Sequence, residues 1–214
     1  SSAELPALDW PALEALALDL HGAGASDAVQ RLLPRVSGLA RLRFELDAWP
    51  HEVIEHDLAN MSSLIELDLD CRGPGPRSLS LTLPPSLERL RLSGFPEVAV
   101  HGECEQLETS IHTLAQLARQ LCEGVRRLTI LDRAPPTRTT LERCAALEWL
   151  SVSAQALELP QLMHDLEVLP HLRTLVVRGL VLSQIPALAQ SRPELAIHGV
   201  DPGWRDPDRW PLPH

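Results

Sequence analysis

The sequence contains no lysine and no tyrosine, and it has only two phenylalanines, five tryptophans and one asparagine. Its 19 basic residues are therefore all arginines, set against 29 acidic residues for a net charge of −10. Because phosphate binding needs clustered basic side chains, this balance argues against a nucleic-acid partner. No apolar run approaches the roughly 20 residues that cross a bilayer, so no membrane partner is expected either.

The scarcity of lysine, asparagine, tyrosine and phenylalanine coincides with abundant alanine, proline, arginine and glycine. GC-rich coding explains all of these biases together, and it indicates a GC-rich bacterium as the source. A second interpretation stays open, in which lysine is excluded so that the protein escapes ubiquitination in a eukaryotic cytosol.

Cysteine is also scarce, and the four present are too scattered for a disulfide framework: Cys71, Cys104, Cys122 and Cys144. The first residues, Ser1 to Glu4, lack the basic-then-apolar pattern of a secretory signal. We expect the natural protein to extend further and to work in a reducing, cytoplasmic environment.

Leucine, by contrast, supplies 42 of the 214 residues, and it recurs in the pattern L-x-x-L-x-L. Seven copies, with some conservative replacements, begin at Leu13, Leu39, Leu64, Leu87, Val125, Leu147 and Leu172, and a degenerate eighth begins at Arg192. The alternating L-x-L part predicts a short strand with one buried face. Helical spacing between strands appears in Val53–Met61 and Leu162–Leu169. A unit this short cannot bury its own apolar face, so neighbouring units must stack.

These repeats resemble the leucine-rich-repeat family, over roughly Leu13 to Gly199. The resemblance implies an α/β solenoid of about seven to eight irregular repeats over residues 1–200, with a curved parallel sheet on the concave side and helices on the convex side. One departure is that the family's usual Asn or Cys, three residues after the last strand leucine, is replaced by His21, Asp47, Arg72, Phe95, Arg133, Gln155 and Leu180. The turns must therefore satisfy their backbone groups in another way.

The longest unit contains 38 residues and predicts a helical insertion near residues 103–124. Its apolar positions from Leu107 to Val125 are typical of one long amphipathic helix. Two additional short strands are expected at Ser78–Leu83 and Val98–Val100.

Three further local features of the sequence lead to structural predictions or to a family resemblance. Thr139 and Glu142 fit a capping box at a helix start. Residues 201–214, rich in Pro and containing Trp204 and Trp210, are expected to form a C-terminal cap, with a free linker as the alternative. The stretch Pro84–Leu90 resembles the Leu-Pro-x repeats of enterobacterial secreted effectors.

Candidate metal and nucleotide sites fit the sequence poorly. His51 and His56 are five residues apart, about 140° around a helix, so we expect a solvated convex helix rather than a zinc site. His101, Cys104, His112 and Cys122 offer zinc ligand types, but Cys122 lies on an apolar face. The Gly22–Gly24 turn lacks the third glycine of a dinucleotide loop and carries Asp27 instead.

Catalytic cysteines are not evident either. The bacterial ubiquitin ligases that follow some effector repeats carry Cys-x-Asp, and none of Cys104, Cys122 and Cys144 begins that motif. We therefore expect no enzyme activity, no cofactor, no metal and no small-molecule substrate.

The positions between the repeat leucines define the inner, concave face of the predicted sheet. One cross-strand row contains Arg41, Glu66 and Arg89, and the next contains Arg43, Asp68 and Arg91. Opposite charges alternate along each row and stabilise modestly, by about 0.2–1 kcal/mol a pair. Two interpretations stay open, a self-neutralising ladder and a polar binding face.

The C-terminal half of this face is apolar instead. Leu131, Trp149 and Val176 are expected to lie exposed on three successive strands, rimmed by Arg127 and Arg178. Because Trp and Arg are enriched at interface hot spots, we predict a partner site here, unless the C-terminal tail folds over it.

Acidic residues concentrate near the start of the chain. Residues 1–70 hold 13 acidic and 4 basic residues, whereas the remaining 144 hold 16 and 15. Such an acidic end suits a basic partner, and the alternative is a solvated convex face.

The leading expectation is a protein–protein interaction module that binds one protein partner through its concave face. Its setting is expected to be a bacterial effector or the recognition domain of one, cytoplasmic or secreted into a host cell by a bacterial secretion system. The alternatives are the substrate-recruiting domain of a larger enzyme such as a ubiquitin ligase, and an inhibitor or immunity-type protein for a basic enzyme.

Overall fold

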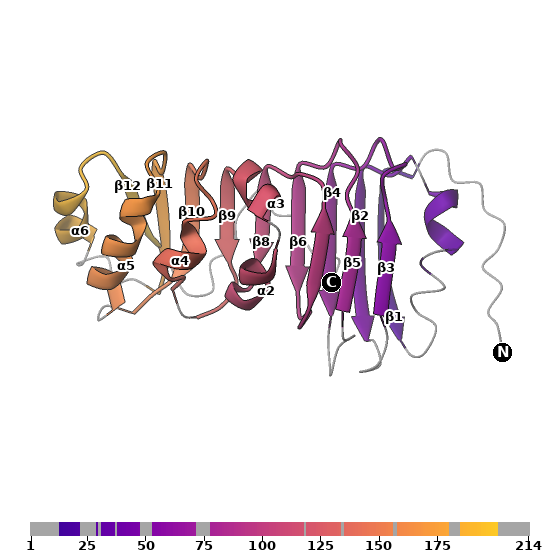
Figure 1. Ribbon diagram of the computed structural model, residues 1–214, viewed down its shortest axis with the longest axis horizontal. Helices are drawn as coiled ribbons and strands as arrows, with labels where there is room; N and C mark the ends of the chain where they lie inside the picture. The colour runs from indigo at the N-terminus through magenta and orange to yellow at the C-terminus, as the bar shows by residue number, and fades with distance from the viewer. Residues whose placement is uncertain are drawn as a thin grey trace.

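The computed structural model (Figure 1) describes residues 13–21, 29, 31–36, 38–47, 53–71, 78–117, 119–133, 135–155, 158–179 and 185–200. Within these residues, nine strands form one parallel main sheet in the order β1-β2-β4-β6-β8-β9-β10-β11-β12. They are β1 (Ala15–His21), β2 (Arg41–Asp47), β4 (Glu66–Cys71), β6 (Arg89–Ser93), β8 (Gln106–Thr109), β9 (Arg127–Ile130), β10 (Trp149–Ser153), β11 (Thr174–Arg178) and β12 (Ala196–Val200). The chain is therefore an α/β protein with a large parallel sheet and few helices.

The repeat leucines build the core because they occupy the same register position on successive strands. The central leucine of each repeat lies opposite that of the next in the series Leu42, Leu67, Leu90, Leu107, Leu128, Leu150 and Leu175. All seven are at most 2% exposed. Burying one leucine contributes about 1.5–3 kcal/mol, so this stack is a main source of stability.

Backbone hydrogen bonds at the start of each strand follow one repeated pattern. The carbonyl of Ala40 accepts from the N–H groups of Ile65 (2.7 Å) and Glu66 (3.1 Å), one repeat later. The carbonyls of Ile65, Glu88, Glu105, Arg126 and Glu148 each accept a similar pair. These backbone groups are thus satisfied by the neighbouring repeat without any polar side chain.

A second, three-stranded parallel sheet contains β3 (Val53–Asp57), β5 (Ser78–Thr82) and β7 (Val98–His101), in that order. Its inward side chains, Ile54, Leu79, Leu81, Val98 and Val100, join the same buried core as the repeat leucines. Both additional strands expected at Ser78–Leu83 and Val98–Val100 are confirmed.

The helix expected over Val53–Met61 is wrong, because residues 53–57 form strand β3. Its side chains alternate between exposed and buried, with Ile54 and His56 inward. Val53, Ile54 and Met61 also fit a helical spacing, but pairing with β5 decides the conformation. His56 consequently lies inside the protein, not on the solvated helix that the sequence predicts.

The single helix expected from Leu107 to Val125 is also wrong. Strand β8 comes first and pairs with β6 and β9 in the main sheet. Two short helices follow, α2 (Ile111–Gln116) and α3 (Arg119–Gly124). The 38-residue unit thus contains one more repeat, in which Cys104 and Thr109 occupy leucine positions and are buried.

Further helical segments are η1 (Leu33–Arg35), α4 (Arg138–Leu141), α5 (Leu159–Asp165), η3 (Leu166–Val168) and α6 (Ile185–Ser191). In Figure 1, β3 and β5 lie over the N-terminal half of the main sheet, and α2 to α6 lie over the C-terminal half. The second layer therefore changes from strands to helices along the chain. No helix in the described segments is long and apolar enough to cross a membrane.

The expected capping box is wrong as well. Helix α4 begins at Arg138 with Thr137 as its N-cap residue, and Glu142 lies at its other end. The Thr137 hydroxyl contacts the hydroxyl of Thr140 at 3.2 Å and caps no backbone N–H. Residues 201–214, expected to form a cap, lie outside the described residues.

Candidate interaction face of the main sheet

The outward face of the main sheet carries the two charged rows that the sequence predicts. Arg41 pairs in register with Glu66, and Glu66 with Arg89. Two residues further along the same strands, Arg43 lies opposite Asp68, and Asp68 lies opposite Arg91. The predicted register of both rows is confirmed.

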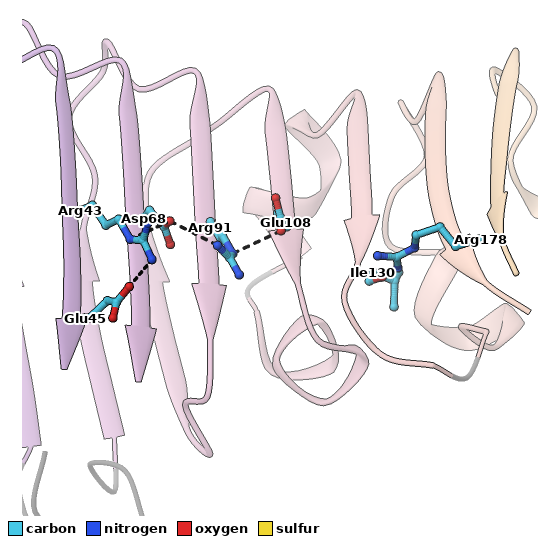
Figure 2. Close-up of polar contacts among 7 residues, drawn as sticks. All are labelled: Arg43, Glu45, Asp68, Arg91, Glu108, Ile130 and Arg178. Carbon is cyan, nitrogen blue, oxygen red and sulfur yellow. Dashed lines mark hydrogen bonds and ion pairs between the residues drawn. The ribbon is translucent and has the colours of Figure 1, made fainter. Parts of the chain in front are cut away.

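Ion pairs connect the second row across four strands. Asp68 Oδ2 lies 3.5 Å from Arg43 Nε and 3.3 Å from Arg91 Nη1. Arg91 Nε lies 3.2 Å from Glu108 Oε1 on β8, and Arg43 also pairs with Glu45 on its own strand. Figure 2 shows these side chains in front of the strands, on the face away from the helices. We call this set, Arg43, Asp68, Arg91 and Glu108, the ion ladder.

The ion ladder is more buried than an exposed surface row. The Arg43 and Asp68 residues are only 6% and 8% exposed. In the neighbouring row, burial raises the pKa of Glu66, and the cations Arg89 and Arg41 oppose that shift. Charges in such surroundings interact more strongly than charges in bulk water, so the ion pairs of the ladder hold their side chains in place.

The first row continues beyond Arg89 with a change of chemistry. Gln106 on β8 follows Arg89 in register, then Arg127 on β9 and Trp149 on β10. The Arg127 guanidinium carbon lies 4.7 Å from the centre of the Trp149 ring, a cation–π contact. A small hollow of about 70 Å³ opens here, bounded by both rows and by Trp149.

The sequence did not predict Gln106 and Glu108 as residues of this face, because residues 103–124 fit a helical insertion. The signal that identifies them is the spacing Cys104-x-x-Leu107-x-Thr109. It matches the repeat pattern once Cys and Thr are allowed at buried leucine positions.

The expected apolar patch is not continuous in the structure. Val176 is only 5% exposed, which contradicts its predicted role as an exposed contact residue. Leu131 and Trp149 are half-buried. They border different hollows, since Leu131 lines a groove of about 450 Å³ with Phe95 and Asp132.

Arg178 lies across the sheet instead of at the rim of a patch. Its guanidinium on β11 reaches past β10 and donates to the carbonyl of Ile130 on β9 (Figure 2). Burial lowers the pKa of this guanidinium. The side chain therefore bridges three strands. Of the three apolar residues expected in the patch, Trp149 is the one that borders the hollow beside the ion ladder.

The remaining sequence candidates do not gather into a reactive site. His56 lies on β3, and burial lowers its pKa to about 4. His51 and the Gly22–Asp27 turn lie outside the described residues. Cys104, Cys122 and Cys144 are all buried thiols, and burial raises the pKa of Cys104 to about 12. In the part of the chain that the structure describes, no cluster of His, Cys, Asp and Glu is arranged to hold a metal ion.

A further hollow of about 540 Å³ lies where η1, β3 and β5 meet, bordered by Leu33, His56, Asn60 and Thr82 among others. Both ring nitrogens of His56 are buried, so the ring presents no donor or acceptor to this hollow. The main-sheet face, with its ion ladder and its Arg127–Trp149 contact, is therefore the better candidate for a functional surface. No protein-family model, no curated protein and no solved structure matches this chain.

Proposed function

We propose that this chain is a leucine-rich-repeat solenoid that binds a protein partner through the outward face of its main sheet. The repeat spacing, the one strand per repeat and the stacked leucines support the solenoid. Parallel strands taken in chain order and covered on one side only leave a broad face available for binding.

The proposed binding role rests mainly on one observation, which is the contact of Arg127 with Trp149 beside the ion ladder. An indole that is half-buried and stacked by an arginine combines the two residue types most enriched at interface hot spots. Neighbouring ion pairs hold the charged side chains in one conformation, which lowers the entropy cost of binding.

The proposed activity is recognition, without catalysis and without a cofactor. An arginine-only basic complement and the repeat resemblance fit a bacterial protein. The narrower form of the proposal is an effector, or the recognition domain of one, that acts in the cytoplasm of a host cell.

Affinity capture from cell lysate followed by mass spectrometry would identify the partner, and the Trp149→Ala variant would then test the face. We expect this variant to bind the purified partner at least ~2 kcal/mol more weakly, which is about 30-fold, with little change in melting temperature.

Val53→Ala is the matched control, because Val53 is 53% exposed on the second sheet, away from the proposed face. It should leave affinity unchanged. Equal binding by the wild type and both variants would contradict the proposal. A large fall in melting temperature of Trp149→Ala with unchanged affinity would show that Trp149 has a structural role only.

A further inference from the structure

Positive and negative side chains alternate along both rows of the main-sheet face over β2, β4 and β6, and the two rows differ at β8. The ion ladder continues the alternation there, because Glu108 lies opposite Arg91 and pairs with it. In the first row, the equivalent position on β8 is Gln106, a neutral amide that separates Arg89 from Arg127. This row therefore has one arginine on each side of an uncharged position.

The spacing of these two arginines suits a shared anion. Adjacent strands lie roughly 4.8 Å apart, so the backbones of Arg89 and Arg127 are separated by about 10 Å. Two arginine side chains can close that distance around one carboxylate. Each guanidinium has five N–H donors, so it can serve a ligand in addition to the contacts it already makes.

The hollow at this position has the right size and lining. Its volume of about 70 Å³ is bordered by Arg89, Gln106, Arg127 and Trp149, and also by residues of both charged rows. The full lining holds four arginines against three carboxylates, Glu66, Asp68 and Glu108, so cations exceed anions by one. A single water molecule needs roughly 10–15 Å³, so the hollow admits a group of a few atoms and not a whole small molecule. The Gln106 amide can donate a hydrogen bond to an anion there, as a glutamate could not.

Neighbouring groups favour an anion in two further ways. Contact with Trp149 holds the Arg127 guanidinium, so less side-chain entropy is lost on binding. Glu108, two residues along the same strand, is paired with Arg91, and this pairing reduces its repulsion of an incoming carboxylate.

We propose that Arg89, Gln106 and Arg127 form a subsite for one carboxylate of the protein partner. It would be an aspartate or glutamate side chain, in a segment that also places an apolar group on Trp149. This inference rests on the proposed function, and it specifies which chemical group of the partner the face recognises. The acidic character of the whole chain makes a basic partner attractive over long distance, whereas this subsite requires an acid locally.

The decisive variant is Gln106→Glu, which places a carboxylate of the protein itself between Arg89 and Arg127. The probes are a blocked peptide, acetyl-Gly-Ser-Leu-Glu-Ser-Gly-amide, and its counterpart with Gln in place of Glu. Binding is followed by the NMR shift of the Trp149 indole N–H, assigned with Trp149→Phe. We expect the wild type to bind the Glu peptide about tenfold more tightly than the Gln peptide, and Gln106→Glu to lose that preference.

Ser153→Glu is the matched control, because it adds the same charge to the same face on β10, outside the hollow. It should keep the preference for the Glu peptide within about threefold, since solvent screens charges at this distance. A higher melting temperature of Gln106→Glu is the second expected readout, because its carboxylate would lie between two cations. Equal shifts with both peptides, or a Gln106→Glu variant that keeps the preference, would overturn the inference.

The two proposals fail in different ways. If Trp149→Ala loses the captured partner while Gln106→Glu binds it as the wild type does, the binding face stands and the carboxylate subsite is overturned. If neither variant affects the partner, both proposals are overturned.

Discussion

Among single residues, His56 combines deep burial with a titratable ring. The ring packs at a 40° tilt against Phe44, with 6.5 Å between ring centres, and the residue is 4% exposed. Within the described residues neither nitrogen has a hydrogen-bond partner, so burial disfavours the charged imidazolium and lowers the pKa to about 4. A weak interaction with the backbone of Glu55 opposes part of that shift.

This lowered pKa makes the free energy of unfolding depend on pH. The unfolded chain takes up the His56 proton near pH 6.5 and the folded protein only near pH 4. The contribution of His56 is therefore complete above pH 6.5 and is lost as the pH falls towards 4, by about 3 kcal/mol in total. Urea midpoints of the wild type and His56→Leu between pH 7.5 and 4 measure it. Parallel pH profiles for the two proteins would contradict this assignment.

At the scale of elements, Asp68 joins three neighbouring strands through two arginines. Removing its carboxylate by Asp68→Ala leaves Arg43 and Arg91 facing each other, although Glu45 and Glu108 still pair with them. We expect a loss of about 2 kcal/mol in the free energy of unfolding, a typical value for a charged hydrogen-bonded pair. Because added salt screens the resulting repulsion, the loss should shrink as salt rises. Denaturant midpoints at low and high salt test this, and a loss independent of salt would disprove the electrostatic cause.

Helix α2 contacts the edge strand of the second sheet through the side chain of Gln116. Gln116 Oε1 accepts the N–H of Val98 on β7 at 2.9 Å, and its Nε2 donates to the carbonyl of Pro96 at 2.6 Å. The amide thus bonds as a neighbouring strand would. Gln116→Ala should cost about 1–2 kcal/mol, because it leaves the buried Val98 N–H unsatisfied. Hydrogen exchange at Val98 should accelerate, whereas exposed Gln155→Ala should change neither quantity. Unchanged protection of Val98 in Gln116→Ala would show that another group closes this edge.

At the scale of the whole molecule, the main sheet could be predicted from the sequence, because each buried leucine repeats at one register position. Strand β8 could not be predicted in this way, because Cys104 and Thr109 replace leucine at two repeat positions. In addition, Leu107 continues the apolar spacing of the helical residues that follow. Two strands of the second sheet were predicted, at Ser78–Leu83 and Val98–Val100, whereas β3 was expected to be a helix.

The charged part of the main-sheet face could also be predicted from the sequence, whereas its apolar part could not. The charged rows follow from alternation alone, and the structure confirms their register. The burial of Val176 and the path of Arg178 depend on contacts between side chains of different strands. Sequence spacing carries no information on such contacts, so the apolar patch was overestimated.

The direction of the main-sheet hydrogen bonds has a mechanical consequence. The strands lie side by side along the long axis of the molecule, so the bonds that join them point along this axis (Figure 1). A force that pulls the two ends of the stack apart would load these bonds in line, and each bond could break without its neighbours. Strands would then peel away in sequence at low force, whereas tension along a single strand would have to shear a whole row of bonds at once. We therefore expect the protein to be more compliant along its length than across it.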